Sequence, residues 1–184
     1  HFTIHSFPTR RSSDLYADPA DETHARQSLG EPADGYPNYS ERAVLYLTNR
    51  ARTQPTAFST EGNYEPSPPL RYDLALSKAA RWQARHIVEA DCWCQDHSSC
   101  CQLEEVDGQV QCANTPGACG QTTPETRVAF WSSRYSGENA ANGQGSAEQA
   151  VEDWIGSTGH WANINGSHSL LGVGQYGRGW VQDF

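Results

Sequence analysis

Three side chains that lie far apart in the sequence have the types needed for chemistry: His97, Glu138 and His160. Two imidazoles and one carboxylate can bind a divalent metal such as Zn²⁺ and leave one coordination position open. In that case His97 and His160 would be the metal ligands. The same groups can equally form a hydrogen-bonded cluster without metal, in which the carboxylate orients both rings.

Each of the three residues also has a simpler structural interpretation. His97 can be a surface histidine beside a disulfide, His160 a capping or core histidine, and Glu138 a turn residue that accepts backbone hydrogen bonds. A helix N-terminus disfavours imidazolium, so His160 is expected to be neutral near pH 7. Glu152, on a predicted helix, is a weaker candidate for the same cleft. The sequence contains neither Gly-x-Ser-x-Gly nor His-Glu-x-x-His, which argues against the common serine-hydrolase and zinc-peptidase motifs.

All the cysteines of the chain lie in one short stretch: Cys92, Cys94, Cys100, Cys101, Cys112 and Cys119. An even number in a loop-rich stretch favours disulfides formed in an oxidising compartment. The rival interpretation, a structural zinc site, needs pairs with two to four residues between the cysteines. Cys92 and Cys94 are too close for that pattern. The sequence does not decide how the six cysteines pair.

Composition narrows the function classes. The 184 residues suffice for one domain with a core. The formal net charge of -9 argues against binding nucleic acid. The single lysine, Lys78, argues against a polybasic membrane-binding patch. No apolar run approaches the roughly 20 residues needed to span a bilayer, so no transmembrane segment is expected. We expect the chain to be a monomer.

The two ends of the chain call for separate treatment. Residues 5–15 read HSFPTRRSSDL, which resembles a translated sequencing adapter, so residues 1–15 are set aside as an artefact. Residues 16–40 are polar and Pro-containing and predict a disordered leader or linker. The folded domain is therefore expected over residues 41–184. The sequence stops inside the last predicted strand, which leaves open that the domain continues beyond residue 184.

Hydrophobic spacing predicts helices outside and strands in the middle, an α+β fold. A helix is expected from Glu41 behind the cap Ser40, and a second one between Asp73 and Ala90. A long cysteine-rich loop follows over residues 91–126. The remaining expected elements are a strand over Arg127–Tyr135, a helix between Ser146 and Gly156, a helical turn over His160–Ile164, and strands over Leu170–Tyr176 and Trp180–Phe184.

Six short motifs follow one another in an order that resembles the bacterial members of the CAP/SCP superfamily, which includes cysteine-rich secretory, antigen 5 and pathogenesis-related proteins. The motifs are Asn49-x-x-Arg52, Pro69-Leu70 with the helix behind it, Asp96-His97-Ser98, Gly137-Glu138-Asn139, Trp154-x2-Ser157-x-Gly159-His160-x2-Asn163, and the closing strands. The resemblance implies an α-β-α sandwich with a small antiparallel sheet between helices. It also implies an extracytoplasmic location, whether secreted, periplasmic or surface-associated. Asn49, Arg52, Asn139, Trp154 and Asn163 would be structural motif residues.

The resemblance has one gap that bears on function. Eukaryotic members carry a second acidic residue shortly after the motif tryptophan, where this chain has Gly156, Ser157 and Thr158. We therefore expect a binding module, with a small apolar or lipid ligand or a protein as its partner. The alternative is a metal-dependent, peptidase-like hydrolase in which the histidines hold zinc and Glu138 is the general base. A third possibility is a structural domain that tolerates loss of all three cleft residues.

Overall fold

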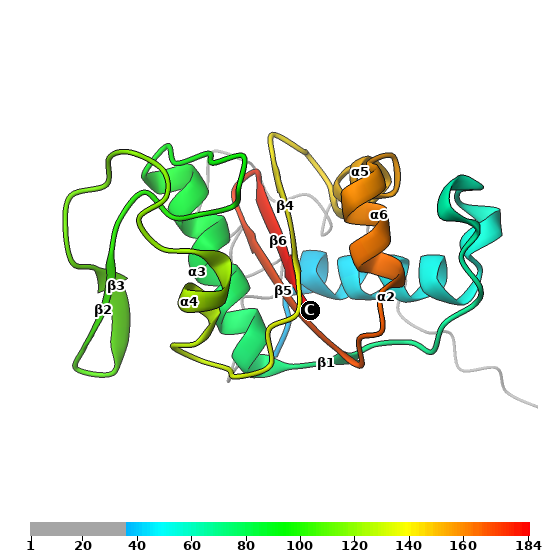
Figure 1. The fold of residues 1–184 in the computed structure, drawn as a ribbon, viewed down its shortest axis with the longest axis horizontal. Coiled ribbons are helices and arrows are strands. Elements are labelled where there is room, and N and C mark those ends of the chain that lie inside the picture. The colour runs from blue at the N-terminus through cyan, green and yellow to red at the C-terminus, as the bar shows by residue number, and fades with distance from the viewer. Residues whose placement is uncertain (1–35) are drawn as a thin grey trace, which may run out of the picture. The chain divides into compact units, whose positions relative to one another are not determined.

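A four-stranded sheet with the order β1-β5-β6-β4 lies at the centre of the fold (Figure 1). The computed structural model describes residues 36–184, and residues 40–184 group into one unit. The strands are β1 (Arg71–Tyr72), β4 (Glu138–Asn142), β5 (Leu170–Tyr176) and β6 (Gly179–Asp183). β6 pairs antiparallel with β5, as expected, and also with β4. The short β1 adds a parallel pairing with β5 that the sequence analysis did not anticipate.

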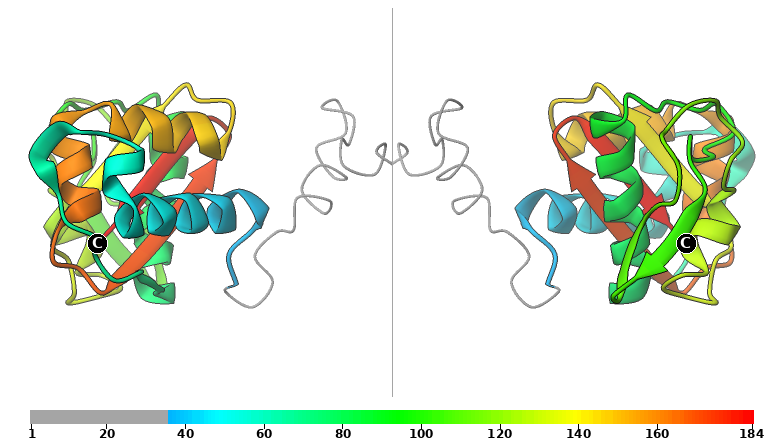
Figure 2. Two further views of the ribbon diagram at one scale, coloured as in Figure 1. Left: turned by 90° about the vertical axis from the view of Figure 1, so that its right-hand side faces the viewer. Right: turned by 90° about the vertical axis from the view of Figure 1, so that its left-hand side faces the viewer.

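Helices cover both faces of this sheet, so the predicted α-β-α sandwich is confirmed (Figures 1 and 2). α3 (Leu74–Glu89) covers one face, while α2 (Tyr39–Thr53), α5 (Ala147–Ile155) and α6 (Thr158–Asn165) cover the other. Successive residues of a strand point to opposite faces. Val181 therefore packs with the alanines of α3, and its neighbour Trp180 packs in the larger cluster with Trp154 and Trp161.

Helix ends follow local signals in the sequence. The side chain of Asp73 accepts a hydrogen bond from the Leu76 amide at 3.0 Å, and the Ser146 side chain accepts one from the Gln149 amide at 3.3 Å. Both are N-cap bonds, which typically contribute about 1 kcal/mol. α5 ends at Gly156, as predicted. The first helix begins at Tyr39, two residues earlier than the expected start.

The predicted strand over Arg127–Tyr135 is wrong. A short helix, α4 (Pro124–Val128), occupies its first residues, and the next strand starts only at Glu138. Thr123 caps this helix by accepting a hydrogen bond from the Thr126 amide at 3.2 Å, and proline suits the first helical turn. The cap and the proline outweighed the β-propensity of the residues that follow.

The cysteine-rich segment over residues 91–126 contains a two-stranded hairpin, β2 (Leu103–Val106) and β3 (Gln109–Cys112), and is not entirely loop. Asp107 and Gly108 form its turn, and both have positive φ, at 52° and 75°. An Asp-Gly pair is a common signal for such a turn. The indole nitrogen of Trp82 donates to the Val110 carbonyl at 3.1 Å, which attaches the hairpin to α3.

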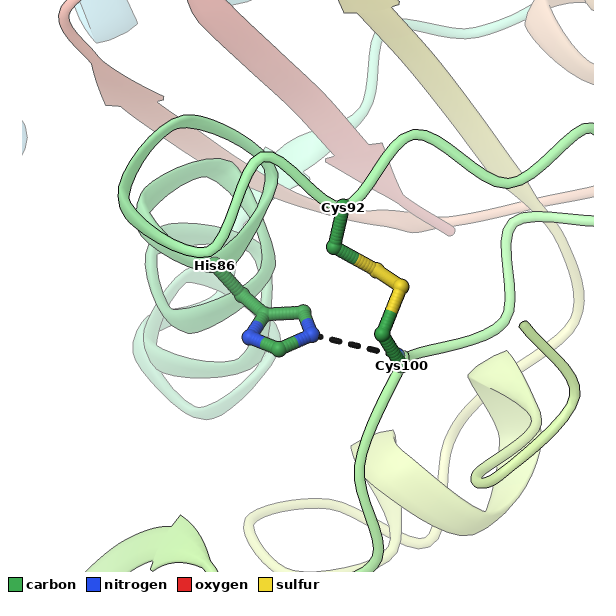
Figure 3. Close-up of side chains that lie close together, drawn as sticks. All are labelled: His86, Cys92 and Cys100. Carbon is green, nitrogen blue, oxygen red and sulfur yellow. Dashed lines mark hydrogen bonds between the residues drawn. A yellow bond between two sulfur atoms is a disulfide. The ribbon is translucent and has the colours of Figure 1, made fainter. Parts of the chain in front are cut away.

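The cysteines form three disulfides, so the disulfide prediction is confirmed. The pairs are Cys92–Cys100, Cys94–Cys119 and Cys101–Cys112. His86 on α3 accepts a hydrogen bond through Nε2 from the Cys100 amide at 3.2 Å (Figure 3). This bond joins the cross-linked segment to the helix that covers the sheet. The artefact predicted over residues 1–15 and most of the leader predicted over residues 16–40 lie outside the described residues.

Two glycines of β5 allow α3 to lie directly against the sheet. A Cβ atom on Gly174 would lie 2.2 Å from the Ala80 carbonyl carbon, which is backbone and cannot rotate away. By contrast, nothing lies within 4 Å of a Cβ built on Gly159 in α6. α3 can therefore lie this close to β5 only because residue 174 is a glycine and has no side chain.

We predict that Gly174→Ala lowers the free energy of unfolding by about 3 kcal/mol or more, because α3 must move away from the strand. Gly159→Ala is the matched control and should leave stability unchanged or raise it by up to about 1 kcal/mol, since alanine favours a helix. Urea denaturation followed by circular dichroism measures both. Equal stability of the two variants would contradict the close packing.

Candidate functional site

The three predicted site residues come together at the start of the edge strand β4. Glu138 is the first residue of this strand, His97 comes from the disulfide-linked segment, and His160 comes from the first turn of α6. His97 Nδ1 lies 3.2 Å from Glu138 Oε1. The rings of His97 and His160 are stacked, with centroids 5.7 Å apart and planes 23° from parallel. The fold thus joins residues from both sides of the sheet at one edge.

Arg127 of α4 forms an ion pair with Glu138. The pair is formed through Glu138 Oε2, with 1% of the Glu138 and 0% of the Arg127 side-chain surface exposed. Burial alone would raise the pKa of Glu138, but the Arg127 guanidinium and then His97 reverse this and lower the pKa below its usual value. Glu138 is therefore a carboxylate at neutral pH, with a fixed orientation. Sequence analysis missed Arg127 because its segment was taken for a strand.

Arg127 also fixes the backbone that carries His97. Its Nη1 donates to the His97 carbonyl at 3.1 Å and to Ser99 Oγ at 3.2 Å. His97 has a φ of 58°, a left-handed conformation that is uncommon outside glycine. Asp96 supports the turn by accepting hydrogen bonds from the amide and the hydroxyl of Ser98, at 3.1 and 2.6 Å. One arginine thus holds both the imidazole-bearing turn and the carboxylate beside it.

His160 is positioned by buried amides. Asn139 Nδ2 donates to the His160 carbonyl at 3.2 Å and to Gln182 Oε1 at 3.0 Å. Asn163 Nδ2 donates to the Glu138 carbonyl and to Asn139 Oδ1, both at 3.0 Å. Burial, and then the neighbouring His97, lower the pKa of His160. This ring is therefore neutral near pH 7, with burial as the main cause.

Asn49, Arg52 and Trp154 lie outside the cleft and hold elements together. Asn49 exchanges two hydrogen bonds with the Leu70 backbone, at 2.9 and 2.6 Å. Arg52 is buried and donates to the carbonyls of Ile164 and Gly166 at the end of α6, where a cation is favourable. Trp154 Nε1 donates to the Ala140 carbonyl at 3.2 Å. The Arg52 bonds hold the end of α6, the helix that carries His160.

Glu152, the weaker candidate, is exposed on α5, and the described residues show no contact between its carboxylate and the three cleft side chains. Asp183 of β6 was missed, although it lies opposite Glu138 in the sheet and is completely buried. The signal in the sequence was an ionisable residue within a strand whose other residues are buried, because such a group needs a partner.

Among residues 36–184, His97, Glu138 and His160 do not form a set of three donor atoms within 4.8 Å of one another. In residues 36–184, sets of three donor atoms within 4.8 Å of one another all contain disulfide cysteines, such as His86 with Cys92 and Cys100 (Figure 3). Those sulfurs are bonded to each other and offer no thiolate. At the cleft, Nδ1 of His97 faces Glu138, which leaves Nε2 for a ligand. No described residue is hydrogen-bonded to the ring nitrogens of His160.

Within residues 36–184, no helix combines the length and the apolar character needed to cross a membrane.

Comparison with known proteins identifies the family. Residues 45–184 match the model of the CAP family, the cysteine-rich secretory protein family. The chain is 27% identical over 168 residues to the uncharacterized protein YkwD of Bacillus subtilis (strain 168), an alignment covering 90% of this chain and 52% of that protein. The fold resembles the crystal structure of an extracellular protein containing a SCP domain from Bacillus anthracis str. Ames. That match has a TM-score of 0.59 and 19% identity, and covers 86% of this chain and 42% of the other. The chain thus spans about half the length of the proteins it matches, and it belongs to the CAP family.

Proposed function

We propose that this chain is an extracytoplasmic binding module in which His97 and His160 form a site for a divalent cation such as Zn²⁺. The observation that carries the proposal is the proximity of two imidazoles, with ring centroids 5.7 Å apart. The ring nitrogens of His160 have no hydrogen-bond partner among the described residues. Neutral imidazole is the form that ligates metal, and the lowered pKa of His160 keeps that ring neutral.

In this proposal Glu138 orients a ligand and does not itself bind the cation. Its Oε1 lies beside Nδ1 of His97, so it favours the tautomer with the proton on Nδ1 and the lone pair on Nε2. Nε2 of His97 and a ring nitrogen of His160 would hold the cation. The bound cation would supply a Lewis-acidic centre for an oxygen or nitrogen atom of the partner. A small apolar or lipid ligand or a protein remains the expected partner.

The hydrolase alternative has less support from the geometry. A general base must reach the proton that it removes and have a pKa near the working pH. The Glu138 side chain is 1% exposed and paired with Arg127, and its pKa is lowered. The second acid that the family's eukaryotic members place in this cleft is absent at Gly156, Ser157 and Thr158. A binding role therefore fits these residues better than general-base catalysis.

The proposed extracytoplasmic location has two supports. Three disulfides within one small domain are typical of proteins that fold in oxidising compartments. The Bacillus anthracis protein with the similar fold is described as extracellular.

We predict that chelator-treated protein binds one equivalent of Zn²⁺ in isothermal titration calorimetry. His97→Ala and His160→Ala should each weaken binding by more than about 100-fold, beyond the usual effect of outer ligands. His168→Ala is the control, because His168 is a half-buried histidine hydrogen-bonded to Ser136 at 2.8 Å. It should bind zinc as the unmodified chain does. Unchanged uptake by a His97→Ala/His160→Ala double variant would contradict the site.

We also predict that the cleft depends on Arg127 for stability. Arg127→Met leaves the buried Glu138 carboxylate unpaired and should cost about 3–5 kcal/mol of unfolding free energy. Arg134→Met is the control: Arg134 is exposed and lies 3.9 Å from Asp73, so the change should stay within about 0.5 kcal/mol. Adding Glu138→Met to Arg127→Met should restore part of the loss. Equal denaturation midpoints for the two single variants would show that the ion pair is dispensable.

A further inference from the structure

We propose that Asp183 is a neutral carboxylic acid in the folded protein and donates a hydrogen bond to Glu138, so that it positions Glu138 beneath the histidine pair. The proposal concerns the support of the site and does not require that a metal binds there.

The sheet places the two carboxyl groups side by side. Glu138 and Asp183 are direct partners in the antiparallel pairing of β4 and β6. Side chains of such partners point to the same face, with Cβ atoms about 4.5–5.5 Å apart. Ala140 and Val181, two residues along each strand on the same face, pack against α3. The two carboxyl groups therefore face the layer formed by α3 and α4, where Asp183 is 0% and Glu138 5% exposed.

Three buried oxygens in this pair have no aligned donor. Both carboxyl oxygens of Asp183, and Oε1 of Glu138, lack a hydrogen bond within the described structure. His97 Nδ1 lies 3.2 Å from that Oε1, close enough for an electrostatic contact that favours a proton on Nδ1, but the two groups are not aligned as a hydrogen bond. An ionised carboxylate can only accept hydrogen bonds. A proton on Asp183 converts one of these oxygens into a donor directed at Glu138.

The charges around the pair lead to the same conclusion. The titratable groups that face Asp183 are Arg127 from α4, Tyr135 from the segment after it, and Glu138 from β4. Burial and the two carboxyl groups raise the pKa of Tyr135, so its phenol is neutral. One cation and two ionised carboxylates would leave an uncompensated buried charge, which is costly. Burial, and then Glu138, raise the pKa of Asp183 well above its usual value, and Arg127 only partly opposes this.

A hydrogen-bonded chain would then run from the sheet to the cleft. Asp183 would donate to Glu138, Glu138 would accept from both Arg127 and Asp183, and its remaining oxygen would face the His97 ring. Asp183 is a positioning residue in this chain, because it acts on His97 only through Glu138.

The first test compares the unmodified chain with Asp183→Asn, which keeps a donor but cannot ionise. A group whose pKa is higher in the folded than in the unfolded state stabilises the fold at low pH and loses this effect as pH rises. Above about pH 4, where unfolded aspartate ionises, the unfolding constant of the unmodified chain should rise by up to about tenfold per pH unit relative to Asp183→Asn. Glu152→Gln, at an exposed site on α5, is the control: its unfolding constant should keep the same ratio to that of the unmodified chain at every pH in this range. A difference between Asp183→Asn and the unmodified chain that stays constant from acid to neutral pH would overturn the proposal.

Two spectroscopic measurements separate positioning from general stability. At neutral pH the unmodified chain should show the infrared carbonyl band of a buried carboxylic acid, and Asp183→Asn should lack it. The nitrogen-15 signal of His97 Nδ1 should be preserved in Asp183→Asn and shifted in Asp183→Leu, which has no donor. If Asp183→Leu does not fold, the infrared band and the pH series decide. Absence of the band, or equal His97 signals in folded Asn and Leu variants, would contradict the proposal.

Discussion

The buried ion pair between Arg127 and Glu138 is the interaction on which the candidate site depends. Arg127 neutralises a carboxylate that could not otherwise remain ionised inside the fold, and it also hydrogen-bonds the His97 carbonyl. Without that guanidinium, Glu138 would have to take up a proton or move toward solvent. Either change would remove the acceptor that faces the His97 ring. The strained backbone of His97, with its positive φ, is held by the same arginine.

The three site residues come together where both helical layers reach the edge strand β4. The disulfide-linked segment brings His97 along the α3 side, and α6 brings His160 along the opposite side. Antiparallel pairing with β6 sets which side chains of β4 face each layer. Glu138 faces Arg127, while its neighbour Asn139 faces α6 and holds the His160 carbonyl. Because successive side chains of β4 point to opposite faces of the sheet, Glu138 contacts His97 on one side and Asn139 holds His160 on the other.

Much of the fold could be predicted from local sequence signals. Asp73 and Ser146 marked two helix starts, Gly156 marked a helix end, and two strand-like segments marked the closing hairpin. The strand expected over Arg127–Tyr135 was wrong because a Thr-Pro cap outweighed β-propensity. The β2–β3 hairpin was overlooked although Asp107-Gly108 indicates a turn.

The candidate site was only partly predictable. The motif order that resembles the CAP/SCP superfamily pointed to His97, Glu138 and His160. Their contacts depend on strand register and on the buried ion pair of Glu138 with Arg127. Arg127 carries no motif of its own, and Asp183 is recognisable only when its strand is known to be buried on both faces. Residues of this kind can be identified only from the charges that the fold brings together in its interior, because short sequence patterns carry no information on those contacts.

The central claim is that Glu138, held by Arg127, fixes the His97 ring against that of His160. Long-range proton–nitrogen NMR of the metal-free protein at neutral pH tests it most directly. The account predicts a His97 ring protonated at Nδ1, with ring-proton contacts to His160. A His97 ring protonated only at Nε2, or one showing no contact with His160, would contradict it.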